Sequence, residues 1–136
     1  MLRLAAAFII VASLALGCDC NWPNVRDAKR RANIVFRGRI TGFRDTGKGY
    51  QMAVFSVDRV WKGNVTATFE MPALEEGAAC LGFWPNLLKV GKNLLVYAYR
   101  FPKETDYITD ICTRTSDVER SKDFADLGPG RAPKSK

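Results

Sequence analysis

The sequence contains no histidine among its 136 residues. Histidine is the usual base of Ser-His-Asp and Cys-His nucleophile systems and the commonest side-chain ligand of catalytic metals, so these chemistries are excluded. The sequence also has no G-x-G-x-x-G motif, no Walker A loop and no EF-hand loop. We therefore expect a protein that is not an enzyme and that holds neither a cofactor nor a metal ion of its own.

Long hydrophobic runs are also scarce, because the chain has only one, at residues 4–16. Arg3 precedes this run, and small residues occupy the −3 and −1 positions before Cys18. This pattern predicts that residues 1–17 are a secretory signal peptide, and the run is short for a membrane span. We expect no membrane span and a secreted, extracellular protein, or one in the periplasm or cell envelope if the cell is bacterial.

Cysteine is limited to four residues, and none of them form a C-x-x-C pair, so a structural zinc site is not expected. An even number of cysteines in an exported domain favours two disulfides. Geometry disfavours a bridge between Cys18 and Cys20, which leaves two pairings open. Cys18 pairs with Cys80 and Cys20 with Cys112, or the two partners are exchanged. Either arrangement closes long loops, worth about 4 kcal/mol each in the chain-entropy model.

The rest of the chain is rich in β-branched and aromatic runs separated by turn residues. These runs predict strands at residues 33–43, 50–61, 65–69, 93–101 and 107–113. Gly38 and Gly42 lie inside the first run and predict a strongly bent or bulged strand.

Two helices are expected to flank these strands. The charged stretch at residues 25–32 predicts one or two helical turns. Ser116 and Glu119 fit a capping box for a C-terminal helix that ends at residues 128–130. The fold class is therefore mainly β, a five-stranded Greek-key barrel of OB type with a short N-terminal helix and a C-terminal helix. It occupies residues 18–128, followed by a disordered basic tail at 129–136.

The net charge is +7, and loss of Arg3 with the leader lowers it to +6. The clearest cluster of cations is Lys29–Arg31, which admits a polyanion as partner, although simple solubility also explains a basic surface. Aromatic residues at strand spacing are expected in the core rather than on a nucleic-acid-binding face: Tyr50, Trp61, Phe69 and Tyr97. We expect no nucleic acid partner and a monomer.

Several motifs together resemble a known family. They are Cys-x-Cys at 18–20, IVFRGRI at 34–40, VDRVWKG at 57–63, AACLGF at 78–83, VGKNLLVYAY at 90–99 and ICTRTSDV at 111–118. From Cys18 to about Leu127 the chain resembles the N-terminal domain of the tissue inhibitors of metalloproteinases, within the netrin-like superfamily of OB-fold domains. It looks like a short, single-domain member of bacterial type.

The resemblance implies a secreted metalloendopeptidase inhibitor. The α-amine and carbonyl of Cys18 would chelate the catalytic zinc of the target, a zinc metalloendopeptidase. The implied disulfides are Cys18–Cys80 and Cys20–Cys112. The implied protease-contacting ridge has eight members: Cys18, Asp19, Cys20, Asn21, Gly77, Ala78, Ala79 and Cys80.

The sequence departs from the family at Asp19, where a small hydroxyl residue is typical, and it lacks the third disulfide of the family's domain. One alternative is a non-inhibitory netrin-like binding module of the cell envelope or extracellular space. Another is a lipoprotein anchored at Cys18, because Gly17-Cys18 is the core of a lipobox. Lipidation would use the Cys18 thiol and exclude both its disulfide and chelation through its amine.

Overall fold

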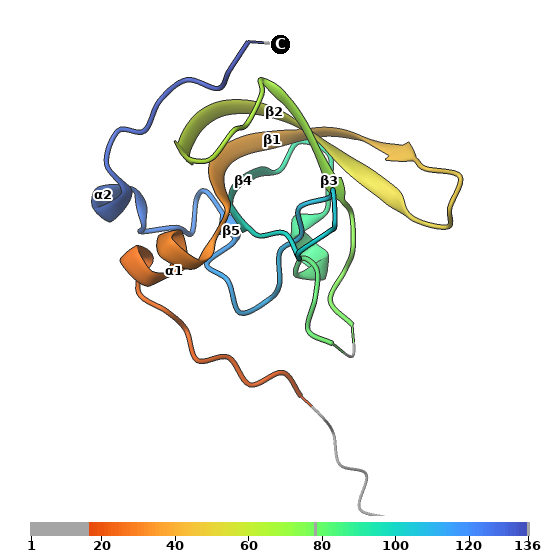
Figure 1. The fold of residues 1–136 in the computed structure, drawn as a ribbon, viewed down its shortest axis with the longest axis horizontal. Helices are drawn as coiled ribbons and strands as arrows, with labels where there is room; N and C mark the ends of the chain where they lie inside the picture. The colour runs from red at the N-terminus through yellow and green to blue at the C-terminus, as the bar shows by residue number, and fades with distance from the viewer. Residues whose placement is uncertain (1–16, 78, 136) are drawn as a thin grey trace, which may run out of the picture.

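The structure is a computed structural model that describes residues 17–77 and 79–135. The expected signal peptide, apart from Gly17, therefore lies outside the described residues. The elements are α1 (Val25–Arg31), β1 (Ile34–Asp45), β2 (Gln51–Lys62), β3 (Thr68–Pro72), the 3-10 helix η1 (Pro85–Leu87), β4 (Asn93–Ala98), β5 (Ser116–Asp117) and α2 (Phe124–Leu127). Figure 1 shows one strongly curved sheet with the two α-helices side by side near one end.

The five strands form a single antiparallel sheet in the order β3-β2-β1-β4-β5. Strand β1 is central because it pairs with β2 along one edge and with β4 along the other. The predicted class is confirmed: the protein is mainly β, with five strands, a short N-terminal helix and a C-terminal helix. No pairing between β3 and β5 occurs in the part of the chain that the structure describes. The closed Greek-key barrel of OB type stays a prediction.

The bend in β1 confirms the expectation drawn from its glycines. The register between β1 and β2 shifts at three places, including Arg37/Gly38 and Ile40/Gly42. At Gly38 an added Cβ would lie 3.2 Å from the carbonyl oxygen of Ser56, which is tighter than most side chains allow. These bulges increase the local twist and let a long strand curl around the core.

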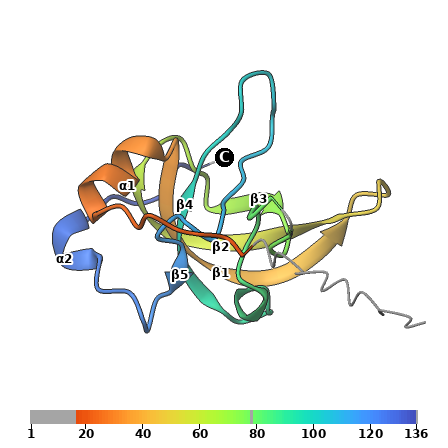
Figure 2. The ribbon, with the colours of Figure 1, turned by 90° about the horizontal axis from the view of Figure 1, so that it is seen from below.

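Alternation along β1 divides the core between two faces of the sheet. Ile34 and Phe36 enter the larger cluster, where the Phe36 and Phe55 rings meet edge to face with centroids 5.4 Å apart. Val35 faces the other way, into a smaller cluster formed with both helices and β4. Its buried members are Val25, Ala28, Ala32, Val35, Leu95, Tyr97 and Leu127. Figure 2 shows α1 and α2 packed together beside this face.

The predicted fifth strand at 107–113 is wrong. Only isolated bridges occur there, at Ile108 and Asp110, because the chain turns immediately afterwards. The Asp110 carboxylate accepts a hydrogen bond from the backbone N–H of Cys112, and its carbonyl accepts one from Thr113. Such side-chain capping of the local backbone competes with a β-ladder. The fifth strand is instead β5, which begins at Ser116.

The predicted capping box at Ser116 and Glu119 is also wrong. Ser116 pairs with Leu95 in the sheet instead of capping a helix. Helix α2 starts later, at Phe124, and ends at Leu127. Gly128 is its C-cap residue, as the sequence predicts. Sheet pairing therefore overrides the local capping signal.

Residues 131–134, within the C-terminal tail for which the sequence predicts disorder, pair with β2 and with the segment that follows it. The backbones of Val60 and Arg131 exchange two hydrogen bonds of 2.8 Å. Lys134 pairs further along, donating to Val65 and accepting from Ala67. Because the tail takes up residues 65–67, the third strand starts only at Thr68 rather than at the predicted 65. No described helix is long and apolar enough to cross a membrane.

Two glycines with left-handed backbone offer a stability test of this packing. Gly63, after β2, has φ +83°, and a Cβ there would lie 2.5 Å from Ile34. Gly47 has φ +71°, but a Cβ there meets nothing within 4 Å. We expect Gly47→Ala to cost about 1 kcal/mol of unfolding free energy through backbone strain alone. Gly63→Ala should cost about 3 kcal/mol, because overpacking adds to that strain.

Denaturant unfolding of the two variants measures this difference. Equal losses would show that the close approach between Gly63 and β1 does not matter for stability.

Candidate functional site

The segment before α1 is extended, and its exposure alternates. Gly17 and Asp19 are exposed, whereas Cys18 and Cys20 are half-buried. On an extended backbone, residues two apart share a face, so both cysteines face the body of the protein and Asp19 faces outward. The residue between the cysteines is thus presented to solvent.

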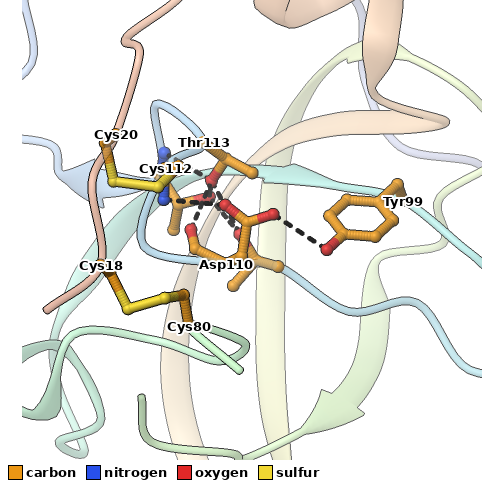
Figure 3. The surroundings of a disulfide bond; sticks show 9 residues. Cys18, Cys20, Cys80, Tyr99, Asp110, Cys112 and Thr113 are labelled. Atoms are coloured by element: carbon orange, nitrogen blue, oxygen red, sulfur yellow. Dashed lines mark hydrogen bonds between the residues drawn. A yellow bond between two sulfur atoms is a disulfide. The ribbon is translucent and has the colours of Figure 1, made fainter. Parts of the chain in front are cut away.

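The two disulfides are Cys18–Cys80 and Cys20–Cys112, with Cα separations of 5.8 Å and 5.0 Å. This is the pairing that the family resemblance implies. The structure thus selects one of the two arrangements that the cysteine positions alone leave open. Figure 3 shows the two bridges leaving the same side of the N-terminal segment, one below the other.

The loop that receives Cys18 is closed by an isolated parallel bridge between Glu75 and Phe83, and it is exposed near Gly77. The Glu76 N–H donates a hydrogen bond to the Phe83 carbonyl, and the Cys80 N–H donates one to the Gly77 carbonyl. Gly77 and Ala79 are exposed, and Cys80 has a left-handed backbone with φ +59°. Ala78 of the predicted ridge lies outside the described residues. The exposed part of this loop and the N-terminal segment are therefore covalently joined and form one exposed edge.

The segments that hold Cys80 and Cys112 support one another. The N–H of Ile111 donates to the Cys80 carbonyl at 3.2 Å, and Leu81 forms an antiparallel bridge with Asp110. The Asp110 carboxylate also accepts the Tyr99 hydroxyl at 2.9 Å (Figure 3). Burial and this hydrogen bond raise the pKa of Tyr99, so its hydroxyl stays protonated as a donor. The two segments to which the disulfides attach are thus hydrogen-bonded to each other.

A buried ion pair fixes the other end of the N-terminal segment. The Arg114 guanidinium donates to the Asp123 carboxylate, at 2.7 Å from Nε, and also to the Pro23 carbonyl at 3.1 Å. The Tyr97 hydroxyl donates to the same carboxylate at 2.9 Å. Asp123 is only 3% exposed, and the charged pair raises the pKa of Arg114. The network therefore ties the segment to α2 and β4.

Sequence patterns do not identify Arg114 and Asp123 as a buried ion pair. Nothing in the local pattern distinguishes them from surface charges, because their burial depends on how α2 packs. The signal was present only in Tyr97, which is an aromatic residue with a polar group in an otherwise apolar strand and therefore needs a partner.

The exposed edge can present backbone groups and one carboxylate to a partner. Its side chains offer only Asp19 and Asn21 as polar groups beyond the disulfides. In the described part of the chain, no group of three or more Cys, Asp and Glu residues is placed to hold a metal ion. The groups that this edge could offer to a metal ion of another protein are therefore main-chain atoms and the Asp19 carboxylate.

Comparisons with known proteins add no further constraint. No protein-family model and no curated protein matches the chain.

We expect Arg114→Met to lower the unfolding free energy by about 2–3 kcal/mol, because it leaves the buried Asp123 carboxylate without its cation. The same change removes the contact with the Pro23 carbonyl, so amide hydrogen exchange at residues 19–22 should accelerate. Denaturant unfolding and hydrogen-exchange mass spectrometry check the two effects.

Arg44→Met is the matched control, because Arg44 makes a comparable bidentate pair with Glu70, but in an exposed position. It should change stability little and leave exchange at the N-terminal segment unaltered. Equal behaviour of both variants would contradict a special role for the buried pair.

Proposed function

We propose that the protein is a secreted metalloendopeptidase inhibitor that acts through Cys18. The observation that carries this proposal is the Cys18–Cys80 disulfide, which joins the predicted mature N-terminus to the loop that is exposed near Gly77. Together these segments form a narrow edge of the kind that fits an open protease cleft.

The proposed mechanism is chelation of the target's zinc. A catalytic zinc has three protein ligands and an open position that water occupies. Cleavage after Gly17 would free the α-amine of Cys18, whose carbonyl lies on the same residue. An α-amine has an ordinary pKa near 8, so a usable fraction is neutral at physiological pH. The amine and carbonyl together would displace the water that the zinc activates for hydrolysis.

Rigidity supports this mechanism. The segment is held at Cys18 and Cys20 by disulfides and at Pro23 by Arg114. Because these restraints already exist in the free protein, little conformational entropy remains to be lost on binding.

Asp19 narrows the class of target. Its side chain faces outward between the two bridged cysteines, where the resemblance implies entry into the pocket beside the zinc. Burying a carboxylate in an apolar pocket is costly without a partner. We therefore propose a target whose specificity pocket carries a cation or stays open to water.

We expect the mature protein to inhibit at least one enzyme of a zinc-endopeptidase panel, with affinity that depends on the N-terminus. One added alanine before Cys18 moves the amine away from the zinc. Inhibition should then fall by about a hundredfold or more, since the chelate is lost while the fold is kept. Inhibition constants for the two forms, with circular dichroism of both, provide the measurement.

The intact mass of the mature protein is the companion measurement. The free-amine form has a mass lowered by the hydrogens lost in two disulfides, whereas a lipoprotein carries an acyl increment and a leftover thiol. The Cys18–Cys80 bridge favours the free-amine form, because it uses the sulfur that a lipid anchor needs. A free-amine protein that inhibits no enzyme in either form would leave the non-inhibitory binding module as the function.

Asp19→Ser should redirect specificity. We expect inhibition of zinc endopeptidases with apolar pockets to improve by about tenfold, because the desolvation cost of the carboxylate disappears. Inhibition of enzymes with cationic pockets should weaken. Glu104→Ser removes the same charge from an exposed loop outside the edge and should change neither. Equal effects of the two variants would mean that only overall charge matters.

A further inference from the structure

A recess lies beside the N-terminal segment and is lined by two exposed tryptophans. It has a volume of about 380 Å³, and its lining includes Trp22, Trp84 and residues 115–117. Trp22 is 52% exposed and Trp84 is 38% exposed. Trp61 differs from both, because it packs against Phe124 and donates its indole N–H to the Gly128 carbonyl. Trp61 serves the fold, whereas Trp22 and Trp84 leave much of their indole surface to solvent.

The polar groups of the recess are of two kinds. Lys92 and Asp117 are paired at 2.5 Å, and this hydrogen bond lowers the pKa of Asp117, so the carboxylate stays ionised beside the lysine. The side chains of Asn86, Ser116 and Arg120 form no hydrogen bond or salt bridge within the described part of the chain, although the Arg120 charge lies close enough to Asp117 to favour its ionised form. The recess therefore offers an amide, a hydroxyl and, with two cations against one carboxylate, a net positive charge.

The walls are held in place before any ligand arrives. Trp22 stands between Cys20, which is bridged to Cys112, and Pro23, whose carbonyl Arg114 holds. Trp84 follows Phe83, which is buried in the main core, and directly precedes η1. Preorganised aromatic surface binds with little loss of side-chain entropy.

This combination selects among ligand classes. An apolar peptide side chain seated on the indoles would cover Asn86, Ser116 and Arg120 without hydrogen bonds, which is costly. A nucleic acid strand would bring several phosphates to a recess whose two cations and one carboxylate leave a single net positive charge. A sugar ring fits both demands, since one face carries C–H groups that stack on an aromatic ring and its rim carries hydroxyls. A carboxylate on that sugar would match Arg120, whose planar guanidinium binds carboxylates in two-point fashion.

We propose that the recess lined by Trp22 and Trp84 binds an acidic saccharide, a hexuronate unit of a polysaccharide. The sugar stacks on the indoles, its hydroxyls bond to Asn86 and Ser116, and its carboxylate bonds to Arg120. The Cys18 amine takes no part, so this site is separate from protease inhibition and goes beyond it.

The test is titration of the disulfide-bonded protein with a hexuronate tetrasaccharide, followed by calorimetry and by intrinsic tryptophan fluorescence. The neutral hexose tetrasaccharide and a glutamate tetrapeptide are titrated in parallel. We expect the hexuronate to bind more tightly than either comparison ligand and to change the fluorescence. Trp22→Ala and Trp84→Ala should each weaken binding by about tenfold. Arg120→Gln should bring hexuronate affinity down to that of the neutral sugar.

Phe101→Ala is the matched control, because Phe101 is 49% exposed and does not line the recess. It should leave binding unchanged, and so should the added N-terminal alanine that abolishes inhibition. The proposal is overturned if the hexuronate does not bind at millimolar concentration, or if the glutamate peptide binds as well as the sugar. It is equally overturned if the two tryptophan variants bind the hexuronate as tightly as the wild type does.

Discussion

Two disulfides attach the first described residues to segments that are themselves hydrogen-bonded to each other. Cys80 and Cys112 belong to neighbouring stretches that meet at the Ile111–Cys80 hydrogen bond. The N-terminal segment has no strand or helix of its own, so its conformation depends on these bonds and on Arg114. Without them, neither the exposed edge at Cys18 nor the wall at Trp22 would have a fixed position. Both proposed binding surfaces thus depend on the two disulfides and on Arg114.

Charge burial provides the second attachment. Asp123 is almost wholly buried, yet it receives two donors from Arg114 and one from Tyr97. Pairing removes most of the cost of desolvating the carboxylate. The same guanidinium reaches Pro23, so the packing of α2 and the position of the N-terminal segment are coupled through one side chain.

The sequence predicted those features that depend on local residue type. The cysteines, the glycines that bend β1 and the apolar alternation of the long strands all act over a few residues. It failed where distant segments compete for the same backbone groups. Asp110 turns the chain where a strand was expected, and Ser116 enters the sheet where a helix cap was expected. The Arg114–Asp123 pair could not be predicted, because two charges reveal their partnership only after α2 packs.

The pairing of the tail with β2 has a consequence for association between copies of the chain. Strand β3 covers β2 only as far as Ser56, which leaves the backbone groups nearer Lys62 at a free sheet edge. Arg131 takes up the hydrogen-bonding groups of Val60 at that edge. An uncovered edge is a template on which another chain adds a strand and begins to aggregate. Arg131 therefore covers this edge of β2 and keeps a strand of another molecule from pairing with it.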